Sequence, residues 1–302
     1  MEDQTAPAPS IPTLKPPRTR RAENPYAKSL RQFARNRFAM VAVAVIVLTV
    51  LVCAAAPYLT TSDPVGRDAA NRLLPPSAAS PMGTDELGRD MLTRVLYGGQ
   101  ISLQIGFMSV LVSVVIGVPL GLISGFVGGK IDNLIMRFMD LILAFPGLIL
   151  VIWLVGLLGS SVTNVIIAIA VFSLPTYARL TRGVTLSLQN AEYVIAAHSV
   201  GATPLRIMAH HVFPNILGSL IVVATLSFSG AIVTGASLSF LGLGVRPPTP
   251  EWGALLSAGR SYLRNAWWIS FFPGIVITVV VLALNIVGDG IRDALDPNLA
   301  NK

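Results

Sequence analysis

Charge is scarce in this 302-residue chain: Asp, Glu, Lys and Arg make up 12% of it, about half their usual share in a soluble domain. Hydrophobic residues make up 53%, and the mean hydropathy is +0.68. This composition excludes a soluble enzyme, a secreted disulfide scaffold and a disordered protein. Because a helix that spans a bilayer needs about 20 apolar residues, the chain has room for several membrane spans.

Cysteine and histidine are also scarce. Cys53 is the single cysteine, so no internal disulfide can form. All three histidines (His198, His210 and His211) fall in one polar segment, so a serine within an apolar run has no histidine base beside it, which makes an intramembrane protease a poor interpretation. The apolar runs contain no ionisable residue of the kind that ion-coupled carriers use. If the protein moves a solute, we expect the energy to come from another molecule.

A nucleotide-binding loop is missing too. The nearest string, Ser124 to Ile131, lacks the first glycine and the final Ser or Thr of a phosphate-binding loop. It also falls between two apolar runs, where a short turn is the simpler interpretation. We therefore expect no cofactor in this chain.

Six apolar runs predict an all-α integral membrane protein with six transmembrane helices. Pro57 is expected to stop the first, and Pro175 cuts the fourth near its end. The runs are Phe38–Ala56, Ile101–Val127, Leu141–Leu158, Val162–Tyr177, Ile216–Ser239 and Ile269–Val287.

The distribution of Lys and Arg predicts that both termini are cytoplasmic. With that orientation the inside segments hold 15 of the 22 basic residues and the outside segments hold 7, as the positive-inside rule requires. The predicted division is a disordered basic tail (1–37), a first transmembrane helix (38–57), an external loop (58–100), a five-helix core (101–287) that includes a cytoplasmic loop (178–215), and a cytoplasmic C-terminal tail (288–302).

Two of the spans carry small or hydroxyl side chains in a pattern. In the second, small residues recur every four positions and predict a close helix-packing seam, although glycine is in any case common in membrane helices; they are Ser109, Ser113, Gly117, Gly121 and Gly125. In the fifth, hydroxyls either bond back to their own helix or line a wet path, and the candidates for that path are Ser227, Ser229, Thr234 and Ser237.

The 178–215 loop contains the start and stop signals of two short helices joined at a glycine. Asn190 is expected to cap the first helix, and Gly201 to end it in the left-handed conformation. Thr203 is expected to cap the second, with Pro204 in its first turn and Pro214 at its end. With only three arginines the loop lacks a nucleic-acid-binding face. A compact knob that fits a groove on another protein is the sharper interpretation, and a structural cap over the bundle is the simpler one.

At these residues the sequence resembles the membrane permease subunits of ATP-binding-cassette importers. That family's cytoplasmic signature is Glu-Ala-Ala, three residues, Gly, nine residues and Ile-x-Leu-Pro. Ala196, Ala197, Gly201 and Pro214 stand in register with it. Ile195 replaces the usual glutamate, while His211 and Phe213 replace later aliphatic residues.

Further strings resemble the peptide/nickel branch of the family, and most of all the C-type subunits of dipeptide permeases. They cover about residues 30–297 and include MGTDELGRD (82–90), LSFLGLG (238–244), PPTPEWG (247–253) and GDGIRDALDP (288–297). Thr84 is expected to cap a short amphipathic surface helix over Asp85–Tyr97. The alternative is a plain charged turn outside the membrane.

The resemblance implies a type I importer permease in the bacterial inner membrane. Its implied partners are a sister permease, two ATPase subunits that use ATP and Mg²⁺, and an extracytoplasmic solute-binding protein, with no nucleic acid. The helices around Gly201 would be the coupling helix that docks on an ATPase subunit.

Dipeptide, oligopeptide, glutathione and nickel remain open as solutes. A free-standing secondary carrier or channel, and a scaffold without transport, are the alternatives from other classes.

Overall fold

The regular elements are helices throughout the part of the chain that the computed structural model describes, residues 25–295. Short 3₁₀ and π turns supplement them. The α-helices are α1 (Pro25–Arg35), α2 (Arg37–Ala54), α3 (Ala56–Leu59), α4 (Met91–Val127), α5 (Gly129–Leu143), α6 (Gly147–Leu158), α7 (Val162–Gln189), α8 (Glu192–Ser199), α9 (Pro204–Ile207), α10 (Phe213–Phe240), α11 (Trp252–Gly259) and α12 (Trp268–Leu295).

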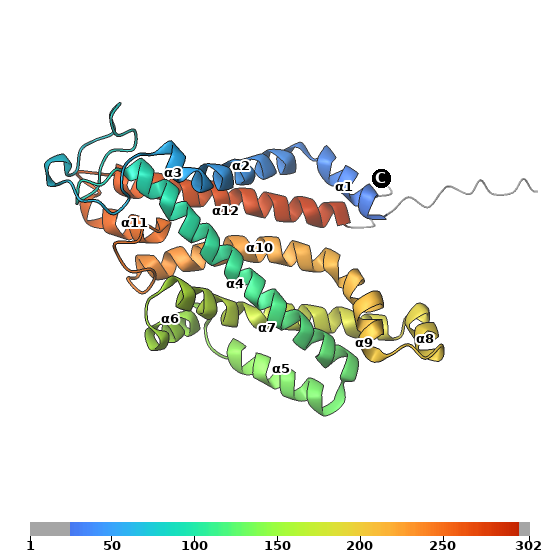
Figure 1. The fold of residues 1–302 in the computed structure, drawn as a ribbon. Helices are drawn as coiled ribbons and strands as arrows, with labels where there is room; N and C mark the ends of the chain where they lie inside the picture. The colour runs from blue at the N-terminus through green and yellow to red at the C-terminus, as the bar shows by residue number, and fades with distance from the viewer. Residues whose placement is uncertain (1–24, 296–302) are drawn as a thin grey trace, which may run out of the picture.

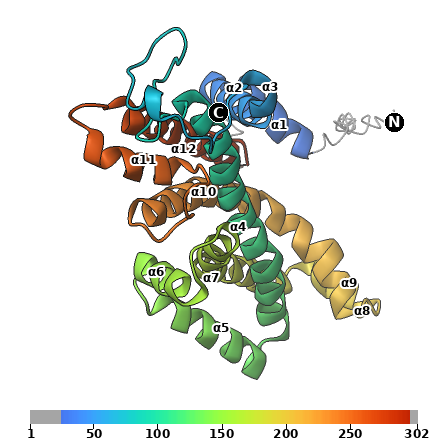
Figure 2. The same ribbon diagram turned by 60° about the vertical axis from the view of Figure 1, so that its left-hand side comes forward.

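The long helices form one elongated bundle with two different ends (Figure 1). Helices α8 and α9 project from one end, which we call the α8 end, and α11 lies with the 60–90 loop at the other, the α11 end (Figures 1 and 2). Helix α1 packs on α12 at the α8 end, where Gln32 Nε2 donates to the Asp293 carbonyl (3.3 Å). Both described ends of the chain therefore lie at the end that carries α8 and α9.

Five helices (α2, α4, α7, α10 and α12) are long and apolar enough to cross a bilayer, and the bent pair α5–α6 makes up to six. The expected third span, Leu141–Leu158, is wrong as a single helix, because the chain bends by 90° between α5 and α6. Pro146 lies at this break and leads into α6; proline disfavours a helical conformation in the residue before it. With 12 residues, α6 is about 18 Å long and too short to cross alone.

The N-terminal expectations also need correction. Residues 25–35 of the expected disordered tail form α1, while residues 1–24 lie outside the described part. Pro57 does not stop the first span: α2 ends at Ala54, and Pro57 lies in the first turn of α3, where its missing N–H has no helical partner to lose. The expected C-terminal tail is helical as far as Leu295, and residues 296–302 lie outside the described part.

Two prolines expected to end helices lie inside continuous helical segments. Helix α7 passes through the buried Pro175 and continues to Gln189, so the predicted 178–215 loop begins about three turns later than expected. Pro214 lies in the first turn of α10, preceded by the π turn Met208–Val212 that joins α9 to α10. Pro214 has no N–H group to donate, and the wider π turn before it lets the helical segment continue without that hydrogen bond.

The predicted surface helix Asp85–Tyr97 is wrong as a separate element. Helix α4 begins at Met91 and runs unbroken to Val127, with Asp90 as its cap: the Asp90 carboxylate accepts from the Thr93 N–H at 2.8 Å. Thr84 lies in an isolated β-bridge with Asp90 and caps no helix. Met91 and Val95, which fall within the predicted surface helix, are buried with Leu255 and Trp268 in one apolar cluster.

The most extensive helix–helix contact in the described part of the chain is that between α4 and α7. The five small residues of the expected stripe all lie in this contact and are buried. Ser109 and Ser113 donate across it to the carbonyls of Ile166 (3.3 Å) and Ala170 (3.0 Å). A Cβ built on Gly117 would lie 2.8 Å from the Cβ of Tyr177. The backbones approach this closely only because the α4 side chains are small; we call this contact the α4–α7 seam.

Adding one methyl group to the seam tests its tightness. A Cβ at Gly121 would lie 2.7 Å from the Thr181 Cβ, so Gly121→Ala is expected to lower the free energy of unfolding by about 1–3 kcal/mol through overpacking. The matched control is Gly183→Ala on α7, where nothing lies within 4 Å and a gain of up to about 1 kcal/mol in helix propensity is expected. Reversible denaturation in mixed micelles measures both, and equal stability of the two variants would contradict a tight seam.

Candidate functional site

The α8–α9 element (residues 190–207) follows α7 and leads through the π turn into α10. Asn190, expected to cap α8, instead ends α7, and the cap position of α8 is Ala191, which makes no side-chain cap bond. Gly201 has φ +81°, the left-handed conformation expected of it. Thr203 and Pro204 take their expected places at the start of α9, although the Thr203 side chain makes no cap bond.

One face of this element belongs to the protein core and the other is exposed. Val194, Ala197 and Ile207 are buried in the same apolar cluster as the bundle. Ala196, Gly201, Thr203 and Pro204 lie on the exposed side, where Leu205 is 74% and Val200 84% exposed. Ile195, which stands where the family signature has glutamate, is also on this surface. The element thus presents a mainly apolar surface away from the bundle, whereas Pro214 lies apart at the start of α10.

The α8–α9 element is attached to the ends of α4 and α7. Gln189, the last residue of α7, donates through Nε2 to the carbonyls of Gly125 (2.6 Å) and Phe126 (3.0 Å) at the end of α4. The Phe126 ring stacks on His198 of α8, with centroids 6.0 Å apart. Gln189 satisfies carbonyls that a helix end leaves without partners, so α8 is fixed relative to both helices.

Ion pairs connect α5 to α7 near the same end. Asp132 accepts from Arg182 Nε (2.6 Å) and Nη2 (2.7 Å), and also from the Ser124 hydroxyl of α4. Its side chain is 14% exposed. A second pair, Arg179–Asp140, lies in the open. Asp132 therefore joins α4, α5 and α7 through one carboxylate.

The four hydroxyls expected along a path occupy different faces of α10. Ser229 is buried toward α12, where its Oγ contacts Asn285 Oδ1 (2.9 Å). Thr234 and Ser237 donate to the carbonyls of Gly230 (2.9 Å) and Val233 (2.7 Å) in their own helix. Ser227 is half-buried and shares a face with Thr234, two turns away. Ser237 also lines a groove of about 400 Å³ at the α11 end.

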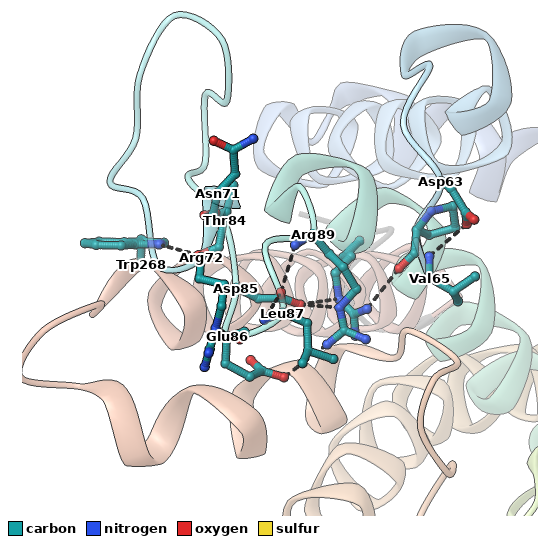
Figure 3. Close-up of polar contacts among 12 residues, drawn as sticks. Asp63, Val65, Asn71, Arg72, Thr84, Asp85, Glu86, Leu87, Arg89 and Trp268 are labelled. Carbon is teal, nitrogen blue, oxygen red and sulfur yellow. Dashed lines mark hydrogen bonds and ion pairs between the residues drawn. The ribbon is translucent and has the colours of Figure 1, made fainter. Parts of the chain in front are cut away.

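At the α11 end, the 60–90 loop is organised around a buried carboxylate (Figure 3). Asp85 Oδ1 accepts from the backbone N–H groups of Leu87 (2.8 Å) and Arg89 (2.9 Å), and Oδ2 accepts from Arg89 Nε (2.6 Å). Arg94 of α4 lies 3.3 Å from the same oxygen and donates to the Pro64 carbonyl. Because the Asp85 carboxylate is hydrogen-bonded and lies against two guanidinium groups, its burial is compatible with a stable fold.

Two tryptophans fix this end of the bundle. Trp268 Nε1 donates to the Thr84 carbonyl (3.0 Å), which joins the 60–90 loop to α12 (Figure 3). Trp252 Nε1 donates to the Val95 carbonyl (2.9 Å), which joins α11 to α4. Next to it, the buried Glu251 caps α11 and accepts from Ser102 of α4 (2.9 Å). Both indole N–H groups and the Glu251 carboxylate are hydrogen-bonded, which holds these elements in one arrangement.

Comparison with known proteins identifies the family. Residues 117–301 match the family of the binding-protein-dependent transport system inner membrane component, and residues 24–76 match the N-terminal transmembrane domain of oligopeptide transport permease C. The chain belongs to this inner membrane component family. The family resemblance predicted from the sequence is confirmed, and this inner membrane component is a multi-pass membrane protein.

Its curated relatives match nearly the whole chain. The di/tripeptide transport system permease protein DppC of Pseudomonas aeruginosa is 45% identical over 92% of this chain and 94% of the relative. The dipeptide transport system permease protein DppC of Alkalihalophilus pseudofirmus is 43% identical over 92% and 91%. The glutathione transport system permease protein GsiD of Shigella flexneri is 44% identical over 96% and 95%.

The fold is found in a solved transporter. This inner membrane component superposes on a chain of the MetNI methionine ABC transporter in an inward-facing conformation with a TM-score of 0.57, over 68% of this chain and 98% of that chain. At 20% identity this likeness concerns the fold alone. It confirms the predicted all-α, type I importer-like fold class.

Several residues of the site were not predicted from the sequence. The Asp132–Arg182 pair joins residues 50 positions apart, so no local pattern indicated it. Glu251 and Trp252 are in the PPTPEWG string, but nothing in that string shows that they reach Ser102 and Val95. The π turn at 208–212 has no sequence signal that we recognise.

The two ion pairs of α5 are expected to differ in strength. Asp132→Asn leaves the partly buried Arg182 without its carboxylate and is expected to lower the free energy of unfolding by about 1–3 kcal/mol. Asp140→Asn, the control, is expected to cost less than about 1 kcal/mol, because both residues of the Arg179–Asp140 pair are exposed to solvent. Denaturation curves of the purified variants in mixed micelles measure both; a larger loss for Asp140→Asn would contradict the assignment.

Proposed function

We propose that this chain is the permease subunit of an ATP-driven importer of di- or oligopeptides and forms one half of its translocation pathway. The observation that carries the proposal is the exposed apolar surface of α8 and α9, in a chain 45% identical to a di/tripeptide permease. A sister permease would supply the other half of the pathway, and an extracytoplasmic binding protein would deliver the peptide.

The α8–α9 element is the proposed docking site for an ATPase subunit. Its docking surface would be built on Ala196, Gly201, Thr203 and Pro204, with Leu205 and Val200 as exposed apolar contacts. Ala197, which is buried in the core cluster, would support this surface from the bundle side and would not touch the partner. An amphipathic helical knob of this kind fits an apolar groove. Pro214 would act indirectly, from the first turn of α10, which follows the π turn.

Two ATPase subunits would hold all the ATP and Mg²⁺ chemistry, and this chain would transmit the motion. The α8–α9 element is connected to α7 at one end and to α10 at the other, so a push on it reaches both helices. Helix α7 is packed against α4 along the seam, which would make the two helices move together. Ser227, Thr234 and Ser237 of α10 would then line the changing cavity, with Ser229 on the opposite face of the helix, toward α12.

Docking on ATPase subunits requires the α8 end to be cytoplasmic. The Lys and Arg distribution favours that orientation, and both described ends of the chain lie at the same end as α8 and α9. In the bacterial inner membrane the α11 end would then lie on the external side, where the binding protein would deliver its solute.

Glutathione is the second candidate solute. The observation in its favour is 44% identity to a glutathione permease over 96% of this chain. Glutathione is itself a tripeptide with carboxylates, so both candidates belong to one chemical class. Solute competition in the assay below separates them.

The test is reconstitution with the partner subunits and the binding protein in proteoliposomes. Wild-type assembly is expected to take up labelled dialanine only when ATP is enclosed in the proteoliposomes and the binding protein is added outside. The isolated chain is expected to hydrolyse no ATP. Leu205→Asp places a charge on the docking surface and is expected to reduce ATPase co-purification and uptake at least tenfold, since an unpaired charge at an apolar contact is costly.

The control is Ser199→Asp, an exposed position in the same element, and we expect it to retain most of the uptake. Uptake driven by an ion gradient without ATPase subunits would contradict the proposed function. Full ATPase binding by Leu205→Asp would contradict the docking site.

A further inference from the structure

A groove at the α11 end carries one cationic group on otherwise apolar walls. It has a volume of about 510 Å³ and is bounded by the ends of α10, α11 and α12. Leu263, Trp267 and Phe271 line it and are each about half exposed. It shares Phe240 and Leu256 with the groove of about 400 Å³ that extends along α10 to Ser237. The two grooves together reach the size of ordinary small-molecule sites.

Arg260 is the cation of this groove. Its guanidinium lies over the Phe240 ring, 5.7 Å from the centroid, a contact that orients the planar group without using its N–H donors. Within residues 25–295, no carboxylate forms an ion pair with it. Arg260 is exposed, so its donors are available to an incoming anion.

The walls that hold Arg260 are connected to one another. Ser257 of α11 donates to the Phe240 carbonyl of α10 (3.0 Å), and Ser270 of α12 donates to the Leu256 carbonyl of α11 (3.2 Å). The start of α11 is fixed to α4 by Glu251 and Trp252. The groove is therefore preformed, which lowers the entropic cost of binding a ligand.

We propose that this groove receives the peptide on the external side and that Arg260 binds its terminal carboxylate. The inference rests on the proposed function, which puts the α11 end outside. A permease for peptides of many sequences cannot rely on side chains, and the terminal carboxylate is the charged group that could pair with Arg260 in every one of them. Guanidinium binds carboxylate in a bidentate manner, while apolar walls accept varied side chains. The charge of the site and the constant charge of the ligand are complementary.

The first measurement is chemical protection in the assembled complex without binding protein. Leu263→Cys, in a Cys53→Ala background, places one reactive thiol in the groove. Dialanine is expected to slow its reaction with N-ethylmaleimide, and dialanine amide is expected to have little effect. Arg260→Gln is expected to weaken the protection by dialanine about ten- to a hundredfold, as for loss of a charge-assisted hydrogen-bonded pair, and Arg260→Lys is expected to restore part of it.

Arg264→Gln is the matched control, because Arg264 is exposed four residues further along and does not line the groove. It removes the same charge and is expected to leave protection unchanged. Equal protection by dialanine and its amide overturns the proposal. Protection by phosphatidylglycerol but not by peptide also overturns it, because the groove would then be a lipid site. A thiol that is unreactive in the assembly under every condition overturns it too, because the sister permease would then cover the groove.

ATP-driven uptake by the same preparations separates the two proposals. If wild-type assembly takes up dialanine and Arg260→Gln does so at an equal rate with equal protection, the carboxylate site is wrong and the importer function stands. If wild-type assembly takes up no peptide of any kind, the proposed function itself fails.

Discussion

The rest of the structure depends on how closely the backbones of α4 and α7 approach. Glycine and serine at every fourth position of α4 allow this approach, and Gly117, Gly121 and Gly125 leave no room for a side chain. In a membrane, where lipid is as apolar as the helices, such contacts replace the hydrophobic effect as the source of association. The seam buries Tyr177 completely and fixes the helix from which the α8–α9 element projects.

The two ends of the bundle are built with different chemistry. At the α8 end, capping by Gln189 and the Asp132 carboxylate hold α4, α5 and α7 together, and an apolar surface is left open beyond them. At the α11 end, buried carboxylates and tryptophan N–H groups fix the 60–90 loop and α11 to the long helices. Under the proposed function, the α11 end with its open groove would be external, and the surface at the α8 end would receive the ATPase subunit that drives the transport.

The sequence was most informative where the signal was local. Runs of apolar residues predicted the long helices, the four-residue spacing predicted which side of α4 is small, and Gly201 followed from its place between two helix signals. Proline was a poor guide to where helices end, since Pro175 and Pro214 lie within continuous helical segments. Neighbouring helices and the π turn compensate for the backbone hydrogen bond that proline cannot donate. Pro146, inside an apolar run, is where the chain does bend.

Contacts between distant residues could not be predicted in this way. Asp132 with Arg182, Ser102 with Glu251 and Thr84 with Trp268 join positions 50 to 184 residues apart. Without knowledge of which helices are neighbours, the sequence does not show whether a charged residue near an apolar run is exposed to solvent or paired with a distant partner. The same reason explains why hydroxyls on α10 could not be divided between helix back-bonding and a path from the sequence.

The central claim is that α4 and α7 move as one unit when the ATPase subunits close. Spin labels on Ile123 of α4 and Leu186 of α7, both exposed beside the seam, report the distance between the two helices in the assembled complex by pulsed electron resonance. The account predicts the same distance distribution in the nucleotide-free and ATP-trapped states, while a pair that joins the two ATPase subunits changes. A distance between α4 and α7 that widens or narrows on ATP trapping would contradict it.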